Sequence, residues 1–192
     1  VHRPETLTQE QTDVLKPLHA ALAQKTYAPF LLHGITGSGK TEVYLNLIQQ
    51  ALEDQREAIV LVPEISLTPQ LVSRFEDRFP GKIAVLHSQL TAAQRQQEWL
   101  KIKKREVSIA IGARSSIFAP FEKLGVIVVD EEHDPSFKQE ERMRYNARDL
   151  ALVRGQLERA VVVLGSATPS LESFYNSKTG KLAYLSLTKR VD

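Results

Sequence analysis

Six short apolar runs, most of them separated by segments with helical periodicity, constrain the fold of this chain more than any other feature. The runs contain few polar residues, which is typical of strands that are buried on both faces of a parallel sheet. They cover residues 30–32, 58–62, 83–86, 107–111, 126–129 and 160–164. The helical patterns cover residues 8–23, 40–53, 69–79, 91–104, 147–158 and a shorter segment from 170. This alternation predicts an α/β fold, a mostly parallel sheet with helices on both faces.

The composition is that of a globular domain. Of the 192 residues, 42% are hydrophobic and 25% are charged, which excludes disordered and fibrous classes. This length suits one domain, and no linker rich in proline, glycine or serine divides it, so we expect a single domain over residues 1–192. No apolar run reaches the roughly 18 residues that span a bilayer, and the first residues lack a signal-peptide pattern, so we expect a cytoplasmic location without membrane contact.

The chain contains no cysteine and has a formal net charge of only +2. Without thiols it offers neither disulfides nor a thiolate metal site, so we expect any bound metal to have oxygen ligands. A net charge this small does not by itself indicate nucleic-acid binding, so a nucleic-acid site would have to be local.

The sequence GITGSGKT, residues 34–41, follows one predicted strand and opens a predicted helix. It fits the pattern G-x-x-x-x-G-K-S/T of loops that bind nucleotide phosphates, and we call it the phosphate loop. Lys40 is expected to reach the β and γ phosphates of ATP, and the Thr41 hydroxyl to bind Mg²⁺. The other expected nucleotide contacts are Gly34, Thr36, Gly37, Ser38 and Gly39. The alternative is a glycine-rich turn without chemistry.

The sequence VIVVDEEHD, residues 126–134, is an apolar strand that ends in carboxylates. Ligands of open parallel sheets bind at the carboxyl ends of the strands. Asp130 is therefore expected to hold Mg²⁺, and Glu131 to orient and deprotonate the water that attacks the γ phosphate. Alone, such a cluster is usually a solvated loop, but beside a phosphate loop it indicates nucleotide hydrolysis.

Two of these segments resemble motifs of the superfamily 2 helicases. DEEH, residues 130–133, resembles their D-E-x-H box, and GSAT, residues 165–168, resembles their third motif. The resemblance implies a RecA-like fold in which the strand before GSAT lies between the phosphate-loop strand and the acidic strand. It also implies that His133, Ser166 and Thr168 relay the state of the nucleotide to bound nucleic acid.

Longer stretches are similar to the bacterial replication-restart, or primosomal, branch of these helicases. The similarity extends from about Leu7 to the end of the chain, and its specificity comes from the order and spacing of the stretches. They read LVPEISLTPQL, LHSQLT, RQQEWL, IAIGARSSIFAPF, VDEEHDPSFKQ and RYNARDLA.

The resemblance assigns binding roles to residues outside the phosphate loop. Gln11 would read the adenine ring, although it also fits a helix cap with Thr8, and both interpretations stay open. Single-stranded DNA contacts are implied for Thr68, Gln70, Arg114, Ser115 and Ser116. For Arg114 the alternative is an ordinary surface ion pair.

Residues 135–145 correspond to an aromatic-rich loop that couples DNA binding to hydrolysis in the family. Phe137 and Tyr145 would stack on bases or on a second lobe, and the alternative for Phe137 is an anchor in the core. Trp99 lies at helical spacing from Leu100 and Ile102, which favours a core position over a stacking platform.

The resemblance implies that residues 1–192 are the first of two helicase lobes. We expect the missing parts to supply the second lobe, with its arginines, and a cysteine-rich zinc module. Implied partners of the whole protein are single-stranded and forked DNA, primosome proteins and single-stranded DNA-binding protein, at replication forks in the nucleoid. Alone, the chain is expected to be a monomer that binds ATP weakly and hydrolyses almost none. Two alternatives to a helicase lobe are an ATP-dependent switch without hydrolysis and a small-molecule kinase.

Overall fold

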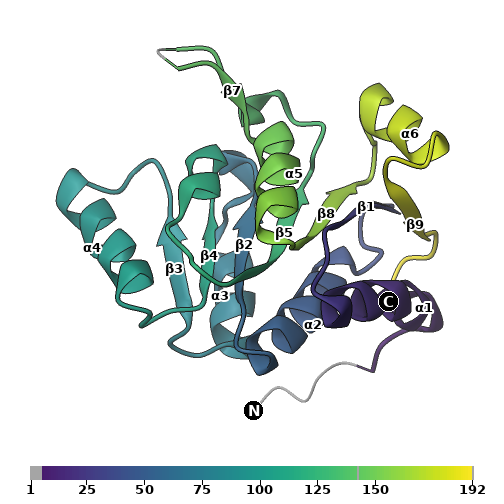
Figure 1. The fold of residues 1–192 in the computed structure, drawn as a ribbon, viewed down its shortest axis with the longest axis horizontal. Helices are drawn as coiled ribbons and strands as arrows, with labels where there is room; N and C mark the ends of the chain where they lie inside the picture. The colour runs from purple at the N-terminus through teal and green to yellow at the C-terminus, as the bar shows by residue number, and fades with distance from the viewer. Residues whose placement is uncertain (1–5, 142, 192) are drawn as a thin grey trace.

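A seven-stranded sheet with strand order β3-β4-β2-β5-β8-β1-β9 forms the centre of the molecule (Figure 1). The computed structural model describes residues 6–141 and 143–191. All neighbouring strands of this sheet pair in parallel. The strands are β1 Ala28–Gly34, β2 Glu57–Leu61, β3 Ile83–Leu86, β4 Ile109–Gly112, β5 Leu124–Asp130, β8 Val161–Ser166 and β9 Ala183–Leu187. A separate antiparallel hairpin joins β6 Lys138–Gln139 to β7 Tyr145–Asn146, and it projects from the body of the molecule.

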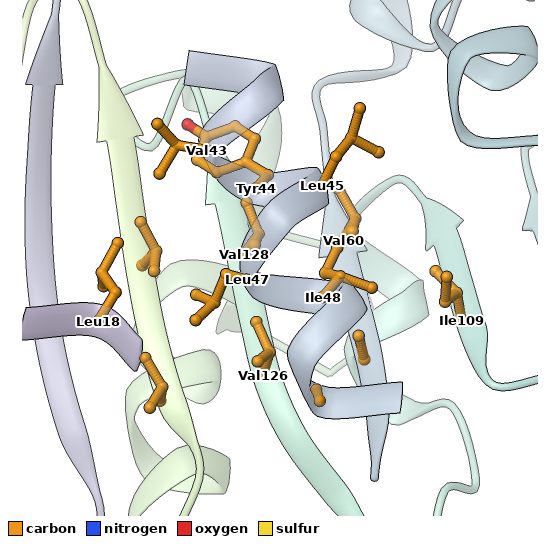
Figure 2. Close-up of a cluster of buried hydrophobic side chains, with 14 of the residues drawn as sticks. Leu18, Val43, Tyr44, Leu45, Leu47, Ile48, Val60, Ile109, Val126 and Val128 are labelled. Carbon is orange, nitrogen blue, oxygen red and sulfur yellow. The ribbon is translucent and has the colours of Figure 1, made fainter. Parts of the chain in front are cut away.

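Helices cover both faces of the sheet. They are α1 Gln9–Gln24, α2 Lys40–Glu53, α3 Pro69–Arg78, α4 Ala92–Lys103, α5 Ala147–Glu158 and α6 Leu171–Lys178. One apolar cluster joins the sheet to α1, α2 and α3, and a second joins its other face to α4 and α5. In the first cluster Leu47 and Ile48 of α2 lie beside Val128 and Val60 of the strands, and Leu18 of α1 belongs to the same cluster (Figure 2).

The predicted alternation of strands and helices is confirmed. All six predicted strands are present, and their residues alternate between the two apolar clusters: Val126 and Val128 face one, while Ile127 and Val129 face the other. The strand before GSAT, β8, lies between β1 and β5, as the resemblance implies. None of the described helices has the length and apolar character needed to cross a membrane.

Two elements differ from the sequence prediction. Strand β9 was not predicted, because AYLSL is short and only partly buried at the edge of the sheet. The region expected as an aromatic-rich loop, residues 135–145, contains a short 3-10 helix, Pro135–Phe137, and most of the β6–β7 hairpin. Such two-residue strands leave no detectable period in a sequence.

A glycine inside α5 is required by close packing on the sheet. A Cβ at Gly155 would lie 2.3 Å from Val162 Cγ2 and 3.4 Å from Tyr27 Cε2. We therefore expect Gly155→Ala to lower the free energy of unfolding by about 1–3 kcal/mol through overpacking. In an open helix position the same change would stabilise the protein by about 1 kcal/mol.

Urea unfolding followed by circular dichroism measures this effect. The control is Val153→Ala on the same helix, where the side chain is 51% exposed and the change is expected to stay within about 0.5 kcal/mol. A more stable Gly155→Ala protein would show that α5 does not pack closely on β8.

Candidate nucleotide site and nucleic-acid face

The phosphate loop connects the end of β1 to the start of α2. Gly37 and Gly39 have φ angles of 80° and 82°, in the left-handed region that favours glycine. The Lys40 ammonium donates a hydrogen bond to the Gly34 carbonyl at 2.7 Å, so its side chain folds back over the loop. Ser38 is buried, and its hydroxyl has no hydrogen-bond partner among the described residues. The phosphate loop is thus a tight turn that encloses the Ser38 hydroxyl.

Gln11 lies against this loop from the start of α1. Its side-chain carbonyl accepts the Thr8 amide at 2.8 Å, while its own backbone amide donates to the Thr8 hydroxyl at 3.2 Å, so the helix cap is present. Its side-chain amide also donates to the Gly39 carbonyl at 3.2 Å. The helix cap and a position at the phosphate loop are therefore compatible. Recognition of the adenine ring by Gln11 stays a prediction.

A segment after β9, residues 188–191, crosses the phosphate loop. The Glu10 carboxylate accepts the amides of Thr188 and Lys189 at 2.9 and 3.1 Å and the Thr188 hydroxyl at 2.5 Å. The Thr188 hydroxyl is the main reason that the pKa of Glu10 is lowered. The Val191 amide donates to the Gly37 carbonyl at 2.9 Å. This packing was not predicted, because it joins residues at opposite ends of the sequence that carry no motif.

Asp130 ends β5 beside the phosphate loop and is held there by a tyrosine. The Tyr44 hydroxyl of α2 donates to Asp130 Oδ1 at 2.7 Å. Asp130 pairs with Gly165 in the register of β5 and β8. A Cβ at Gly165 would lie 1.7 Å from the Tyr44 hydroxyl oxygen, so only glycine leaves room for this contact. Tyr44 was missed because its spacing in α2 is that of any core aromatic residue.

Burial and the charge of the nearby Lys40 have opposite effects on the pKa values of Asp130 and Glu131, and burial has the larger effect. Burial raises the pKa of Asp130, against the hydrogen bond from Tyr44 and the positive charge of Lys40. Burial and the charge of Asp130 raise the pKa of Glu131, which Lys40 opposes. Glu131 also has a φ of 50°, an uncommon conformation for a residue other than glycine. The structure therefore brings Lys40, Asp130 and Glu131 to one place.

The three residues assigned to coupling form one hydrogen-bonded group. His133 Nδ1 lies 2.7 Å from the Ser166 hydroxyl, and His133 Nε2 lies 3.4 Å from the Thr168 hydroxyl. The Thr168 amide donates to the Ser166 hydroxyl at 2.9 Å. His133 Nε2 also lies 3.7 Å from a carboxylate oxygen of Glu131. The expected contact of the GSAT segment with the acidic box is thus present.

Glu132, the variable position of the D-E-x-H box, has a structural role that the sequence does not indicate. Its side chain is fully buried and accepts the Ser170 amide at 2.7 Å and the Ser173 hydroxyl at 2.9 Å. Arg148 of α5 donates to it at 3.4 Å and to Glu172 of α6 at 2.8 Å. These contacts connect α5 and α6 to the acidic box.

The residues expected to face DNA divide into exposed and buried ones. Thr68 caps α3 by accepting the Leu71 amide and is exposed, as are Gln70 and Ser115. Ser116 is completely buried, with its hydroxyl against Gly112, so it cannot touch DNA in this conformation. The expectation of a DNA contact at Ser116 is not supported by this burial.

Arg114 forms no ion pair with a described residue and instead supports the hairpin. Its Nη1 donates to the carbonyls of Ser136 and Lys138 at 3.2 and 3.1 Å. Phe137 is 1% exposed and packs in the second apolar cluster. It is therefore the core anchor, and no base can stack on it in this conformation. Tyr145 is partly exposed and meets Phe118 edge to face, with ring centroids 5.2 Å apart.

Comparison with known proteins adds family information to this geometry. Residues 8–176 match the family model described as DEAD/DEAH box helicase. The replication restart protein PriA of Bacillus subtilis is 51% identical over 189 residues, which are 98% of this chain and 24% of that protein. PriA of Haemophilus influenzae is 48% identical over 96% of this chain and 25% of that protein. The chain spans about a quarter of the length of these relatives.

Solved structures share the fold. A structure of RecG bound to a three-way DNA junction has a TM-score of 0.72 at 20% identity, covering 99% of this chain and 25% of that chain. The helicase domain of Hef from Pyrococcus furiosus has a TM-score of 0.59 at 17% identity, covering 94% of this chain and 40% of that chain.

The Tyr44 hydroxyl provides a test of the buried contact to Asp130. We expect Tyr44→Phe to lower the free energy of unfolding by about 1–3 kcal/mol, because the buried carboxylate loses a hydrogen bond. Urea denaturation measures the change. The control is Tyr27→Phe, because the Tyr27 hydroxyl makes no hydrogen bond to another described residue. Equal small effects in both variants would contradict the importance of the contact.

Proposed function

This chain belongs to the DEAD/DEAH box helicase family, and we propose that residues 1–192 form the ATP-binding lobe of an ATP-dependent DNA helicase that acts in replication restart. The observation that carries the proposal is the convergence of Lys40, Asp130 and Glu131 at the carboxyl edge of the sheet. A cation at a phosphate loop, beside two carboxylates with different surroundings, suits phosphoryl transfer from ATP to water.

The phosphate loop fits a nucleotide. The left-handed glycines Gly37 and Gly39 let the backbone curl, and the Ser38 hydroxyl, which has no hydrogen-bond partner among the described residues, would be available to a phosphate oxygen. Gly34, Thr36 and Gly39 would complete the cradle, while Lys40 would exchange the Gly34 carbonyl for the β and γ phosphates. Gln11, whose side-chain amide contacts the Gly39 carbonyl, would read the adenine ring.

Thr41 and Asp130 would hold Mg²⁺, because a hydroxyl and a carboxylate supply the oxygen ligands that this ion prefers. When bound, Mg²⁺ would neutralise developing negative charge on the phosphates. Asp130 would be kept in place by Tyr44. Glu131 would hold the attacking water and accept its proton, and a raised pKa makes it a stronger base than an ordinary glutamate.

Hydrolysis would be coupled to DNA through the loops at the same edge. His133 touches Ser166 and Thr168 and lies near Glu131, so a change at the γ phosphate can reach the GSAT segment. Thr68, Gln70, Arg114 and Ser115 would contact single-stranded DNA. Tyr145 would offer an aromatic surface, while Ser116 and Phe137 would support this face from inside.

In the whole protein, two lobes would close on ATP and step along DNA. A second lobe would supply arginines to the transferring phosphate, and zinc would belong to another part of the protein. Forked DNA, primosome proteins and single-stranded DNA-binding protein are the proposed partners, in the cytoplasm at replication forks. RecG, whose fold this chain shares, was solved on a three-way DNA junction.

Glu131 distinguishes hydrolysis from the alternative of a nucleotide-dependent switch, which needs no general base. In the full-length helicase we expect Glu131→Gln to lower DNA-stimulated ATP turnover by about 10²–10⁴-fold, the contribution of general base catalysis. ATP binding should persist, as measured with a fluorescent ATP analogue. Lys40→Ala should weaken that binding, and Glu53→Gln at the far end of α2 serves as control. Full turnover in Glu131→Gln would favour the switch.

The isolated chain of 192 residues is expected to hydrolyse almost no ATP, with or without DNA, because no second lobe supplies arginines to the γ phosphate. A phosphate-release assay, with the full-length helicase as the positive control, measures this difference. The chain should still bind ADP weakly and sediment as a monomer. Substantial DNA-stimulated turnover by the chain alone would overturn the assignment of an incomplete site.

A further inference from the structure

We infer that Trp99 and Arg95 of α4 form a further single-stranded DNA site, in which a base stacks on the Trp99 ring and Arg95 binds the adjacent phosphate. The inference rests on the proposed function, since it extends the DNA face beyond the motifs that the family resemblance supplied. Neither residue was assigned a DNA contact from the sequence, where Trp99 fitted a core position better.

The site is a hollow of about 420 Å³ at the carboxyl edge of the sheet. This volume is within the range of roughly 300–1,000 Å³ that is usual for ligand sites. Trp99 and Arg95 line it from α4, Arg114 and Ser115 from the segment after β4, and Tyr145 from the hairpin. Segments that are distant in sequence therefore combine two aromatic rings and two guanidinium groups around one space.

Trp99 is placed to receive a base. It packs partly against the second apolar cluster and remains partly exposed. It also lines a second groove, of about 790 Å³, with Leu100, Lys103 and Pro120. The indole is thus fixed by the core while it borders open space on two sides. A rigid, half-buried ring offers stacking area at a small cost in conformational entropy.

The charge around the hollow suits a phosphate backbone. Arg95 is exposed and has no salt-bridge partner among residues 6–141 and 143–191. The lining contains one carboxylate, Glu64, which already accepts the Ser88 amide at 3.0 Å and the Ser88 hydroxyl at 2.8 Å. Two guanidinium groups against one satisfied carboxylate leave an electropositive site, as an anionic strand requires.

The order of the strands gives the DNA a continuous path. Strands β2, β4 and β3 are consecutive neighbours and parallel, so the segments that follow them lie in a row along one edge. The segment after β2 carries Thr68 and Gln70, and the segment after β4 carries Arg114 and Ser115. One strand spacing further, about 4.8 Å, the segment after β3 leads into α4 and the hollow. This continuity favours a nucleic-acid strand over a docked peptide.

Trp99 is the single tryptophan of the chain, so tryptophan fluorescence reports on the surroundings of this residue alone. The chain is titrated with an oligothymidylate at low salt while a fluorescent label on the oligonucleotide reports total binding by anisotropy. We expect the tryptophan emission to fall and to saturate at the same DNA concentration as the anisotropy, because a stacked base quenches the indole.

Variants test the same contacts without relying on the emission. Trp99→Ala should weaken oligothymidylate binding about 5- to 150-fold, the range for loss of one base–aromatic stack, and Trp99→Phe should retain most of the affinity. Arg95→Ala should lower the slope of log affinity against log salt by about 1. Lys16→Ala on α1 is the control for loss of an exposed cation. Unchanged ADP binding and thermal melting would verify that each variant is folded.

The outcomes separate this inference from the proposed function. Saturating anisotropy with unchanged tryptophan emission and unchanged affinity of Trp99→Ala would overturn the stacking site and leave the DNA function intact. Absence of oligonucleotide binding by both the chain and the full-length helicase would overturn both.

Discussion

The candidate site depends on the position of β8 between β1 and β5. In this order Gly165 lies beside Asp130, and the missing Cβ leaves the space through which the Tyr44 hydroxyl reaches the carboxylate. The same strand delivers Ser166 to His133. A side chain at position 165 would displace the tyrosine and uncouple α2, which begins in the phosphate loop, from the acidic box. One strand order therefore aligns the phosphate loop, the acidic box and the GSAT segment.

Glu131 and Glu132 are adjacent in the acidic box but lie in different environments. Glu131 is partly exposed, has a strained backbone and a raised pKa, and keeps its carboxylate available. Glu132 is buried and receives hydrogen bonds from Ser170, Ser173 and Arg148, so its carboxylate is fully used. A buried charge is tolerated when it is paired and hydrogen-bonded. The Glu131 carboxylate is thus accessible to a ligand, whereas the Glu132 carboxylate holds α5 and α6 in place.

The proposed nucleic-acid face shows where sequence reasoning was incomplete. Motif position suggested Ser116 and Phe137 as DNA contacts, but both are buried and support the face from inside. Trp99 was predicted as a core residue, and it packs partly against the second apolar cluster, but it also borders two hollows. A stretch of sequence shows which residue types are present, but not which side of a 3-10 helix or loop turns outward. That orientation depends on contacts such as those of Arg114 with the hairpin.

By itself, the sequence determined the alternation of strands and helices, the phosphate loop and the acidic strand, because these depend on local periodicity and on glycine and carboxylate spacing. The place of β8 in the sheet came from family resemblance. Only the tertiary structure decided that Tyr44 holds Asp130, that Glu132 joins α5 to α6, and that residues 188–191 cross the phosphate loop. These contacts join residues far apart in the chain through hydrogen bonds that no local pattern encodes.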